Sequence, residues 1–119
     1  MIFTSYYDSE KIDKAIDEGR FIVSISRSEP KWIEVDAKFW ALAPNYDLFQ
    51  KSKKGMTDES FIYEYWEQLD KNKDYVLDIL RFLDKRNAIM CCWCEDYEYC
   101  HRHCLSEWAK KYNFDIKEI

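Results

Sequence analysis

Glycine and proline are scarce in this 119-residue chain, which has only two of each. Because these residues supply most hinges and turns, their scarcity indicates a compact and rather rigid body. No apolar run approaches the ~20 residues of a membrane-spanning helix, so we expect no membrane partner. The first ten residues carry neither the basic segment nor the apolar core of an export signal. We therefore expect a protein of the reducing cytoplasm, where thiols stay free, bind metal or act in catalysis.

Several familiar motifs are also absent. The chain has no glycine-rich phosphate loop, which disfavours the usual nucleoside triphosphatase and dinucleotide folds. It has no Gly-x-Ser-x-Gly or His-Glu-x-x-His motif, and no arginine follows a cysteine at the spacing of a phosphatase loop. The formal net charge of −5 opposes non-specific nucleic-acid binding, which needs many phosphate contacts. A local basic pocket remains compatible with this charge.

Hydrophobic residues make up 47% of the chain and aromatic residues 18%. A chain of this length is typical of one domain and can bury most of its apolar surface without disulfides. There is no internal repeat and no low-complexity linker. Residues 1–119 are therefore predicted to form a single globular domain.

Short apolar or β-branched stretches alternate with segments of helical periodicity. The predicted strands are Met1–Ser5, Phe21–Ser26, Ala88–Trp93 and Phe114–Ile116. The predicted helices begin at Asp8 or Ser9, at Thr57 or Asp58, at Asn72, and around Cys100, where the first turn carries the reactive side chains. Between the second strand and second helix, Lys31–Lys54 shows no clean period. We predict an irregular, aromatic-rich segment there, with at most a short helical turn, acting as a lid or as ordinary packing.

This alternation predicts a three-layer α/β fold, with a mostly parallel sheet flanked by helices. In such folds ligands bind beyond the carboxyl ends of the strands. The stretch Ala88–Tyr112 holds all five cysteines and both histidines, arranged as a strand, an acidic loop and a helix. Free backbone N–H groups at the start of that helix would favour an anion. The sequence therefore predicts a site at this point.

Cys100 is the first candidate for a catalytic residue. A thiol on the first turn of a helix, beside His101 and Arg102, should have a lowered pKa and be a better nucleophile. Acidic neighbours such as Glu95 act the other way, and a buried cysteine can also be a small apolar residue of the core. His103 and Glu95 are the candidates for a catalytic acid or base.

Arg102 is the predicted clamp for a phosphate or carboxylate, unless it pairs with a nearby glutamate. Polar residues also end the first two predicted strands, and in a parallel sheet they would meet Cys100 at one edge. The predicted ligand is an anionic small molecule such as a nucleotide, a nucleobase derivative or a nucleic-acid end, on which tyrosines could stack. The alternative is that the polar residues at the strand ends are ordinary turn residues and that the tyrosines are aromatic residues at the rim, with no role in binding. The candidate ligand-binding residues are Arg102, Arg27, Ser5, Tyr6, Tyr7 and His101.

The clustered thiols and imidazoles could also bind zinc. Zinc sites commonly use paired ligands at C-x₂₋₄-C and H-x₃₋₅-H spacings. Here the spacings are C-x-C, then C-x₃-C with H-x-H inside it. A site made of Cys92, Cys94, Cys100 and Cys104 is geometrically possible, but it fits no common knuckle. Zinc is therefore possible but not favoured, and no metal ligand is assigned.

The chain also resembles a known family. The matching pieces run through the chain in order: Ile2–Tyr7, Val23–Arg27 with Pro30 and Trp32, Leu42–Pro44, and Cys92-Trp93 followed by Cys100–His103 and Glu107-Trp108. Together they are similar to the domain of unknown function 488 family, whose most recognisable signature is Cys-His-Arg after a strand and an acidic loop. The resemblance implies a small cytosolic α/β domain with no established activity. Relatives tend to have a glutamate two residues after the strand cysteine, where this chain has Cys94, with Glu95 one place later.

These observations leave three functional hypotheses. The first is an enzyme in which Cys100 is a nucleophile, or Glu95 or His103 an acid or base, acting on an anionic ligand. The second is a binding module that sequesters a nucleotide or a protein partner and catalyses nothing. The third is a metal-stabilised structural protein.

Overall fold

The computed structural model describes residues 1–95 and 100–119. In that part of the chain, five strands form one sheet in the order β3-β2-β4-β1-β5. All the strand pairs in it are parallel, which confirms the predicted parallel sheet. The strands are β1 (Ile2–Tyr6), β2 (Ile22–Ser24), β3 (Ala37–Lys38), β4 (Ile89–Cys92) and β5 (Ile116–Glu118).

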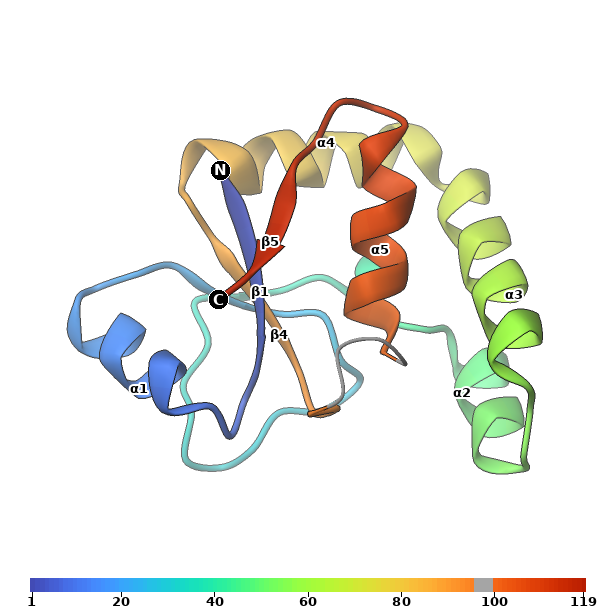
Figure 1. Ribbon diagram of the computed structural model, residues 1–119, viewed down its shortest axis with the longest axis horizontal. Coiled ribbons are helices and arrows are strands. Elements are labelled where there is room, and N and C mark those ends of the chain that lie inside the picture. Colours follow the sequence, from blue (N-terminus) through green and yellow to red (C-terminus); the bar gives the residue numbers. More distant parts are fainter. Residues whose placement is uncertain (96–99) are drawn as a thin grey trace.

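Helices cover both faces of the sheet (Figure 1). Apolar side chains of α1 pack in a small core on one face, whereas α3, α4 and α5 build the larger core on the other. The predicted three-layer α/β architecture is therefore confirmed. The helical elements are α1 (Glu10–Asp17), the 3-10 turn η1 (Trp40–Leu42), α2 (Tyr46–Lys53), α3 (Asp58–Lys71), α4 (Lys73–Lys85) and α5 (His101–Lys110).

Polar caps start the helices where the sequence predicts them. The Ser9 hydroxyl accepts a hydrogen bond from the backbone N–H of Lys11, and the Thr57 hydroxyl accepts one from Ser60. Such caps satisfy N–H groups that have no partner within the helix. Gly19, just beyond α1, has a φ of 76°, in the left-handed region that favours glycine after a helix.

The segment Lys31–Lys54 is more regular than predicted. It contains β3, η1 and α2. Their periodicity is faint because β3 has only two residues and Leu48 is the single fully buried residue of α2. The last strand also lies further along the chain than the predicted Phe114–Ile116, since β5 pairs with β1 through Ile116 to Glu118. This shift places Glu118 at the carboxyl edge of the sheet.

The carboxyl ends of the central strands meet at one edge of the sheet. Cys91 of β4 is in register with both Ser5 of β1 and Ser24 of β2. The start of α5 lies at the same edge, because the His101 ring is hydrogen-bonded to the carbonyl of Ile25, just beyond β2. The fold therefore brings residues from distant parts of the sequence to one place.

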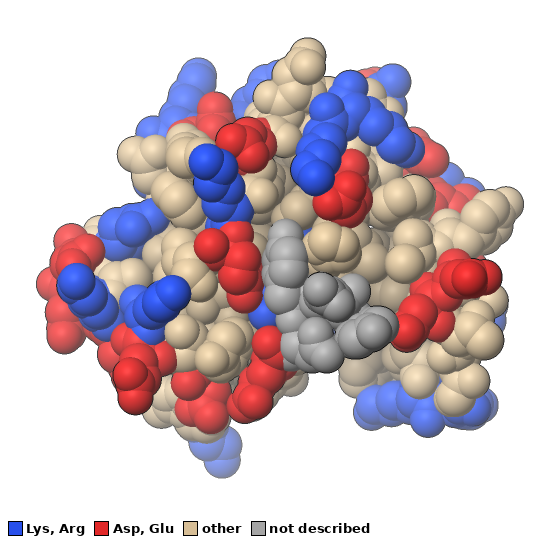
Figure 2. Space-filling view, in the orientation of Figure 1, with Lys and Arg blue, Asp and Glu red and all other residues tan. Residues whose placement is uncertain are grey.

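Charged side chains of both signs are interspersed on the face shown in Figure 2. A mixed surface of this kind offers nucleic-acid phosphates no continuous basic track on that face. Among the described residues, no helix is both long enough and apolar enough to span a bilayer.

Candidate functional site

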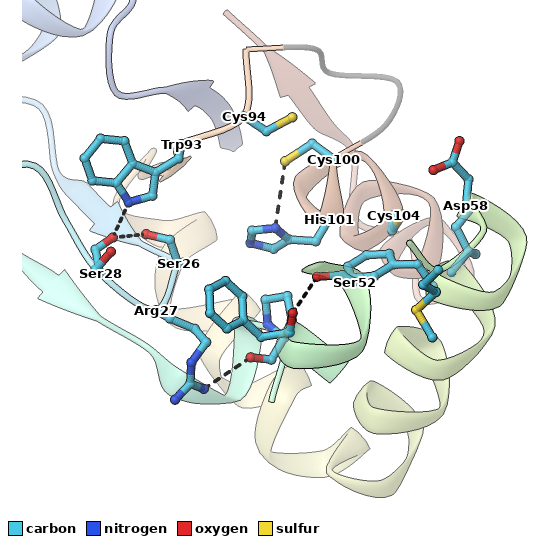
Figure 3. Close-up of a pocket in the computed structure, with 15 residues that line it drawn as sticks. Ser26, Arg27, Ser28, Ser52, Asp58, Trp93, Cys94, Cys100, His101 and Cys104 are labelled. Atoms are coloured by element: carbon cyan, nitrogen blue, oxygen red, sulfur yellow. Dashed lines mark hydrogen bonds between the residues drawn. The ribbon is translucent and has the colours of Figure 1, made fainter. Parts of the chain in front are cut away.

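A pocket of about 490 Å³ opens at the carboxyl edge of the sheet (Figure 3). It is lined by residues that follow β2 and β4, by α2 and the first turns of α3, and by the start of α5. Its walls are largely apolar and include the rings of Phe49, Phe61 and Trp93. A cavity of this size with few polar groups is typical of small-molecule sites.

The polar groups of the pocket lie at different ends. In Figure 3, Arg27 and Asp58 lie at opposite ends, and the Arg27 guanidinium points away from the Cys100 sulfur. Ser26 and Ser28 line the same end as Arg27, whereas Cys100 lies between these ends near α5. The pocket therefore has a cationic end, an anionic end and a thiol between them.

Arg27 lies in a cage of aromatic rings. Its guanidinium carbon is 5.2 Å from the ring centroid of Trp40, 5.4 Å from that of Tyr46 and 5.8 Å from that of Phe49. Its Nη1 donates a long hydrogen bond of 3.4 Å to the carbonyl of Pro44. Within the described residues no carboxylate forms an ion pair with it. Cation–π contacts thus hold the charge in place without neutralising it.

Two cysteine sulfurs are in direct contact beside the pocket. The Sγ atoms of Cys92 and Cys100 are 2.9 Å apart, and both cysteines are free. Cys100 lines the pocket, whereas Cys92 is buried behind it and is not among the described lining residues. Nη1 of Arg102 donates a hydrogen bond of 3.2 Å to the Cys92 sulfur. The guanidinium therefore favours the thiolate on Cys92 and leaves the Cys100 thiol as the donor between the two sulfurs.

The pKa values of the two thiols move in opposite directions. The hydrogen bond from Cys100 lowers the pKa of Cys92, burial opposes this, and the Arg102 charge lowers it further. The hydrogen bond to Cys92 and burial raise the pKa of Cys100 to about 12, although His101 acts against the rise. The first negative charge of the pair therefore belongs mainly to Cys92, and not to the predicted nucleophile Cys100.

Arg102 is fully buried, and its partners belong to the protein itself. Its Nε and Nη2 atoms donate to the two carboxylate oxygens of Glu118, at 3.0 and 2.9 Å. Its Nη1 also donates to the carbonyl of Cys94. Burial alone would lower the pKa of Arg102, but the bonds to Glu118 and the Cys92 sulfur raise it above its ordinary value. Arg102 holds Cys92 in place and is not among the described residues that line the pocket.

His101 links the thiols to β2. Its Nε2 is 2.6 Å from the carbonyl oxygen of Ile25. Because a carbonyl can only accept, Nε2 must carry a proton, and Nδ1 of the neutral ring is left as an acceptor. Nδ1 lies 3.8 Å from the Cys100 sulfur and is oriented towards it. His101 is therefore placed to take a proton from Cys100.

Tyr7 supports the floor of the pocket and does not line it. It is buried, and its hydroxyl is 2.9 Å from the Ser24 hydroxyl and 2.7 Å from that of Ser26. Burial raises the pKa of Tyr7 to about 12, against the effect of the two serines. Ser26 and Trp93 both line the pocket, and the Trp93 ring packs edge-on against Tyr7 with centroids 5.5 Å apart, so Tyr7 supports the lining through these two residues.

Four other residues that the sequence predicts for the site are not among the described residues that line the pocket. Ser5 is buried, with its hydroxyl hydrogen-bonded to the Tyr6 carbonyl. The Tyr6 ring lies 5.8 Å from the Arg102 guanidinium carbon. Glu95 is exposed after β4, and His103 is half-buried on α5. Ser5 near the end of β1, Arg27 beyond β2 and Arg102 on the first turn of α5 all lie towards the same edge of the sheet, and of these three Arg27 alone lines the pocket.

Cys92, Cys100 and His101 are the one group of described residues whose ligand atoms, all within 4.8 Å of one another, could hold a metal ion. Two thiolates on a tetrahedral zinc would lie about 3.8 Å apart, given Zn–S bonds of about 2.3 Å. The observed separation is 2.9 Å, and the Arg102 guanidinium beside Cys92 opposes a further cation. The short sulfur–sulfur distance and the neighbouring guanidinium both disfavour a zinc ion between these two sulfurs.

Comparison with known proteins identifies the family. A family model described as the active DUF488-N3 subclade matches residues 7–113. The chain therefore belongs to the DUF488 family, which the Cys-His-Arg signature and its neighbours indicate. No curated protein and no solved structure matches the chain.

Proposed function

We propose that the protein binds an anionic small molecule with an aromatic part, such as a nucleotide, a nucleobase derivative or a nucleic-acid end. The observation that supports this most directly is Arg27, a caged cation with no ion-pair partner among the described residues. An arginine fixed in this way loses little side-chain entropy when it binds a phosphate or carboxylate. Arg27, and not the buried Arg102, is the proposed contact for the anion.

The lining of the pocket suggests how such a ligand would be oriented. Its anionic group would lie near Arg27, Ser26 and Ser28, away from the carboxylate of Asp58 at the other end. The aromatic part would lie against the rings of the apolar wall. A ring bound there would lie beside Cys100.

Two side chains of the pocket could act on the bound molecule. We propose Cys100 as the nucleophile and His101 as its base, since Nδ1 of His101 is oriented towards the Cys100 sulfur. This pairing replaces the suggested acid–base role of His103, which lies outside the described lining. The description of the family model as active is compatible with catalysis.

A non-catalytic, ligand-sequestering module is the second candidate. It is favoured by the pKa of Cys100, which is raised to about 12 and keeps this thiol mostly protonated at neutral pH. A ligand that co-purifies unchanged and is never turned over would support this alternative. A ligand recovered in altered form would support the enzyme.

Thermal-shift screening against nucleotides and sugar phosphates is expected to identify a stabilising ligand. Arg27→Ala should bind that ligand at least about tenfold more weakly, because a hydrogen bond to a charged group contributes about 1.5–3 kcal/mol. The dissociation constants can be measured by isothermal titration calorimetry.

Arg20→Ala is the matched control for this experiment. Arg20 also packs on an aromatic ring, 5.0 Å from the centroid of Phe3, and donates to one carbonyl, that of Asn87. It lies before β2, at the opposite edge of the sheet, so its removal should leave the affinity unchanged. Equal affinities for wild type and Arg27→Ala would show that the anion is bound elsewhere.

A further inference from the structure

The contact between Cys92 and Cys100 has a chemical consequence of its own. We propose that these cysteines form a dithiol that reduces small disulfides by thiol–disulfide exchange and closes into an intramolecular disulfide. The proposal rests on the proposed function only in that the same pocket admits the substrate. The substrate class is a low-molecular-weight disulfide.

The two sulfurs occupy the positions of an attacking and a resolving thiol. Cys100 lines the pocket, so a small molecule that enters meets its sulfur first. Cys92 lies directly behind, with its sulfur 2.9 Å from that of Cys100. A disulfide needs a separation of about 2.05 Å, so a sulfur displacement of about 1 Å closes the bond. Cys91, the neighbour of Cys92, points into the core on the other face of the sheet.

Neighbouring residues assist both steps, although the charge on Cys92 itself opposes the loss of the Cys100 proton. Arg102 donates to the Cys92 sulfur and is itself paired with Glu118, so a thiolate on Cys92 is stabilised without an excess of positive charge. Cys100 is the N-cap residue of α5, but its side chain makes no cap hydrogen bond there, so removal of its proton depends on His101. Nδ1 of His101 can take the Cys100 proton.

The exchange balances without any further reagent. Cys100 gives its proton to His101 and attacks one sulfur of the small disulfide, and the other sulfur leaves as a thiolate with the electron pair of the broken bond. The Cys92 thiolate then attacks the Cys100 sulfur, and the second small thiolate leaves. One leaving group takes the proton from His101 and the other takes one from solvent. Two electrons pass from the protein to the substrate, which is released as two thiols.

The test uses the reduced full-length chain with two probes, neutral hydroxyethyl disulfide and anionic oxidised glutathione. The intact mass should fall by two hydrogen atoms, and two small thiols should be released per chain. Cleavage after Glu95 and Arg102 separates Cys100 and Cys104 from the peptide that holds Cys91, Cys92 and Cys94, and fragment-ion mass spectrometry of the linked peptides then identifies which cysteine is joined to Cys100. Cys92→Ser should stop at a mixed disulfide on Cys100. Cys100→Ser should react at least about tenfold more slowly, because its remaining buried thiolate is shielded from the pocket.

Cys91→Ala is the matched control, since Cys91 is the buried cysteine next to Cys92, is not among the described residues that line the pocket, and should not take part. The proposal is overturned if wild type keeps the small thiol on Cys100, or joins Cys100 to Cys104. Stoichiometric zinc that blocks the reaction until it is chelated would also overturn it. If the neutral probe forms the Cys92–Cys100 disulfide in a protein that binds no anionic ligand, the proposed function is wrong and this inference stands. If neither probe oxidises the cysteine pair in a protein that still binds its anionic ligand, this inference is wrong and the proposed function stands.

Discussion

Replacing Arg102 by alanine is expected to lower the free energy of unfolding by about 3–5 kcal/mol, because it leaves the buried Cys92 sulfur and the half-buried Glu118 carboxylate without their donor and removes a large buried side chain. Arg102 is fully buried and is bonded to Glu118, the Cys92 sulfur and the Cys94 carbonyl. Its loss releases the end of β5 from α5 and removes the cation beside the thiol pair. Urea denaturation followed by tryptophan fluorescence measures the change.

Arg81→Ala is the control, because Arg81 forms an exposed ion pair of similar length with Asp78. Exposed pairs of this kind contribute about 0–1 kcal/mol. A loss of less than about 1 kcal/mol for Arg102→Ala would contradict the structural role of this residue. In that case Arg102 would again be a candidate contact for the anionic ligand.

Alkaline pH is expected to destabilise the protein steeply. Burial raises the pKa of Cys91 to about 12 and that of Cys104 to about 11, and Cys92 together with burial raises that of Cys100 to about 12, all from 9.0. The unfolded chain therefore loses these protons first. The stabilisation is fully present below about pH 9 and is lost as the pH rises from there towards about 12. With three such thiols, the free energy of unfolding should fall by up to about 4 kcal/mol per pH unit between about pH 9 and 10, and more steeply above, where buried Tyr7 and Tyr65, whose pKa values are also raised, add to the slope.

Urea denaturation at a series of pH values, with a reducing agent present, measures this slope. Between about pH 9 and 10, Cys91→Ala should reduce the slope by about a third, because one proton fewer separates the folded and unfolded states. Cys92 makes the opposite contribution, since its lowered pKa gives stabilisation that is lost as the pH falls. A free energy of unfolding that is flat up to about pH 11 would mean that these thiols are exposed to solvent.

The sequence predicts the layers of the fold because most of the core elements carry strong local signals. β2 is β-branched, and Ser9 and Thr57 are helix caps that act as predicted. The elements within Lys31–Lys54 escape prediction because their burial comes from tertiary packing and not from a periodic apolar face. Glu118 escapes because it ends a short edge strand whose register only the structure fixes.

The candidate site is predictable in outline and not in detail. The rule that ligands bind at the carboxyl edge of a parallel sheet locates Arg27, Cys100 and His101. Neighbours on a helix point about 100° apart, which is why His101 faces the pocket while Arg102 faces Glu118. Whether His101 or Arg102 faces the pocket depends on how α5 packs against β4 and β5. No local sequence pattern determines this packing. The role of Cys92 depends likewise on its contact with a residue eight positions away.

Protection of Cys100 from alkylation tests the central claim most directly, namely that an anionic ligand held by Arg27 occupies the pocket beside this thiol. The rate of carbamidomethylation of Cys100 by neutral iodoacetamide can be followed by peptide mass spectrometry, with and without the best stabilising nucleotide or sugar phosphate. We predict that the ligand slows the reaction in wild type and Arg20→Ala, and has no effect at the same concentration in Arg27→Ala. A rate that no member of the panel changes, or equal protection in Arg27→Ala, would contradict the claim.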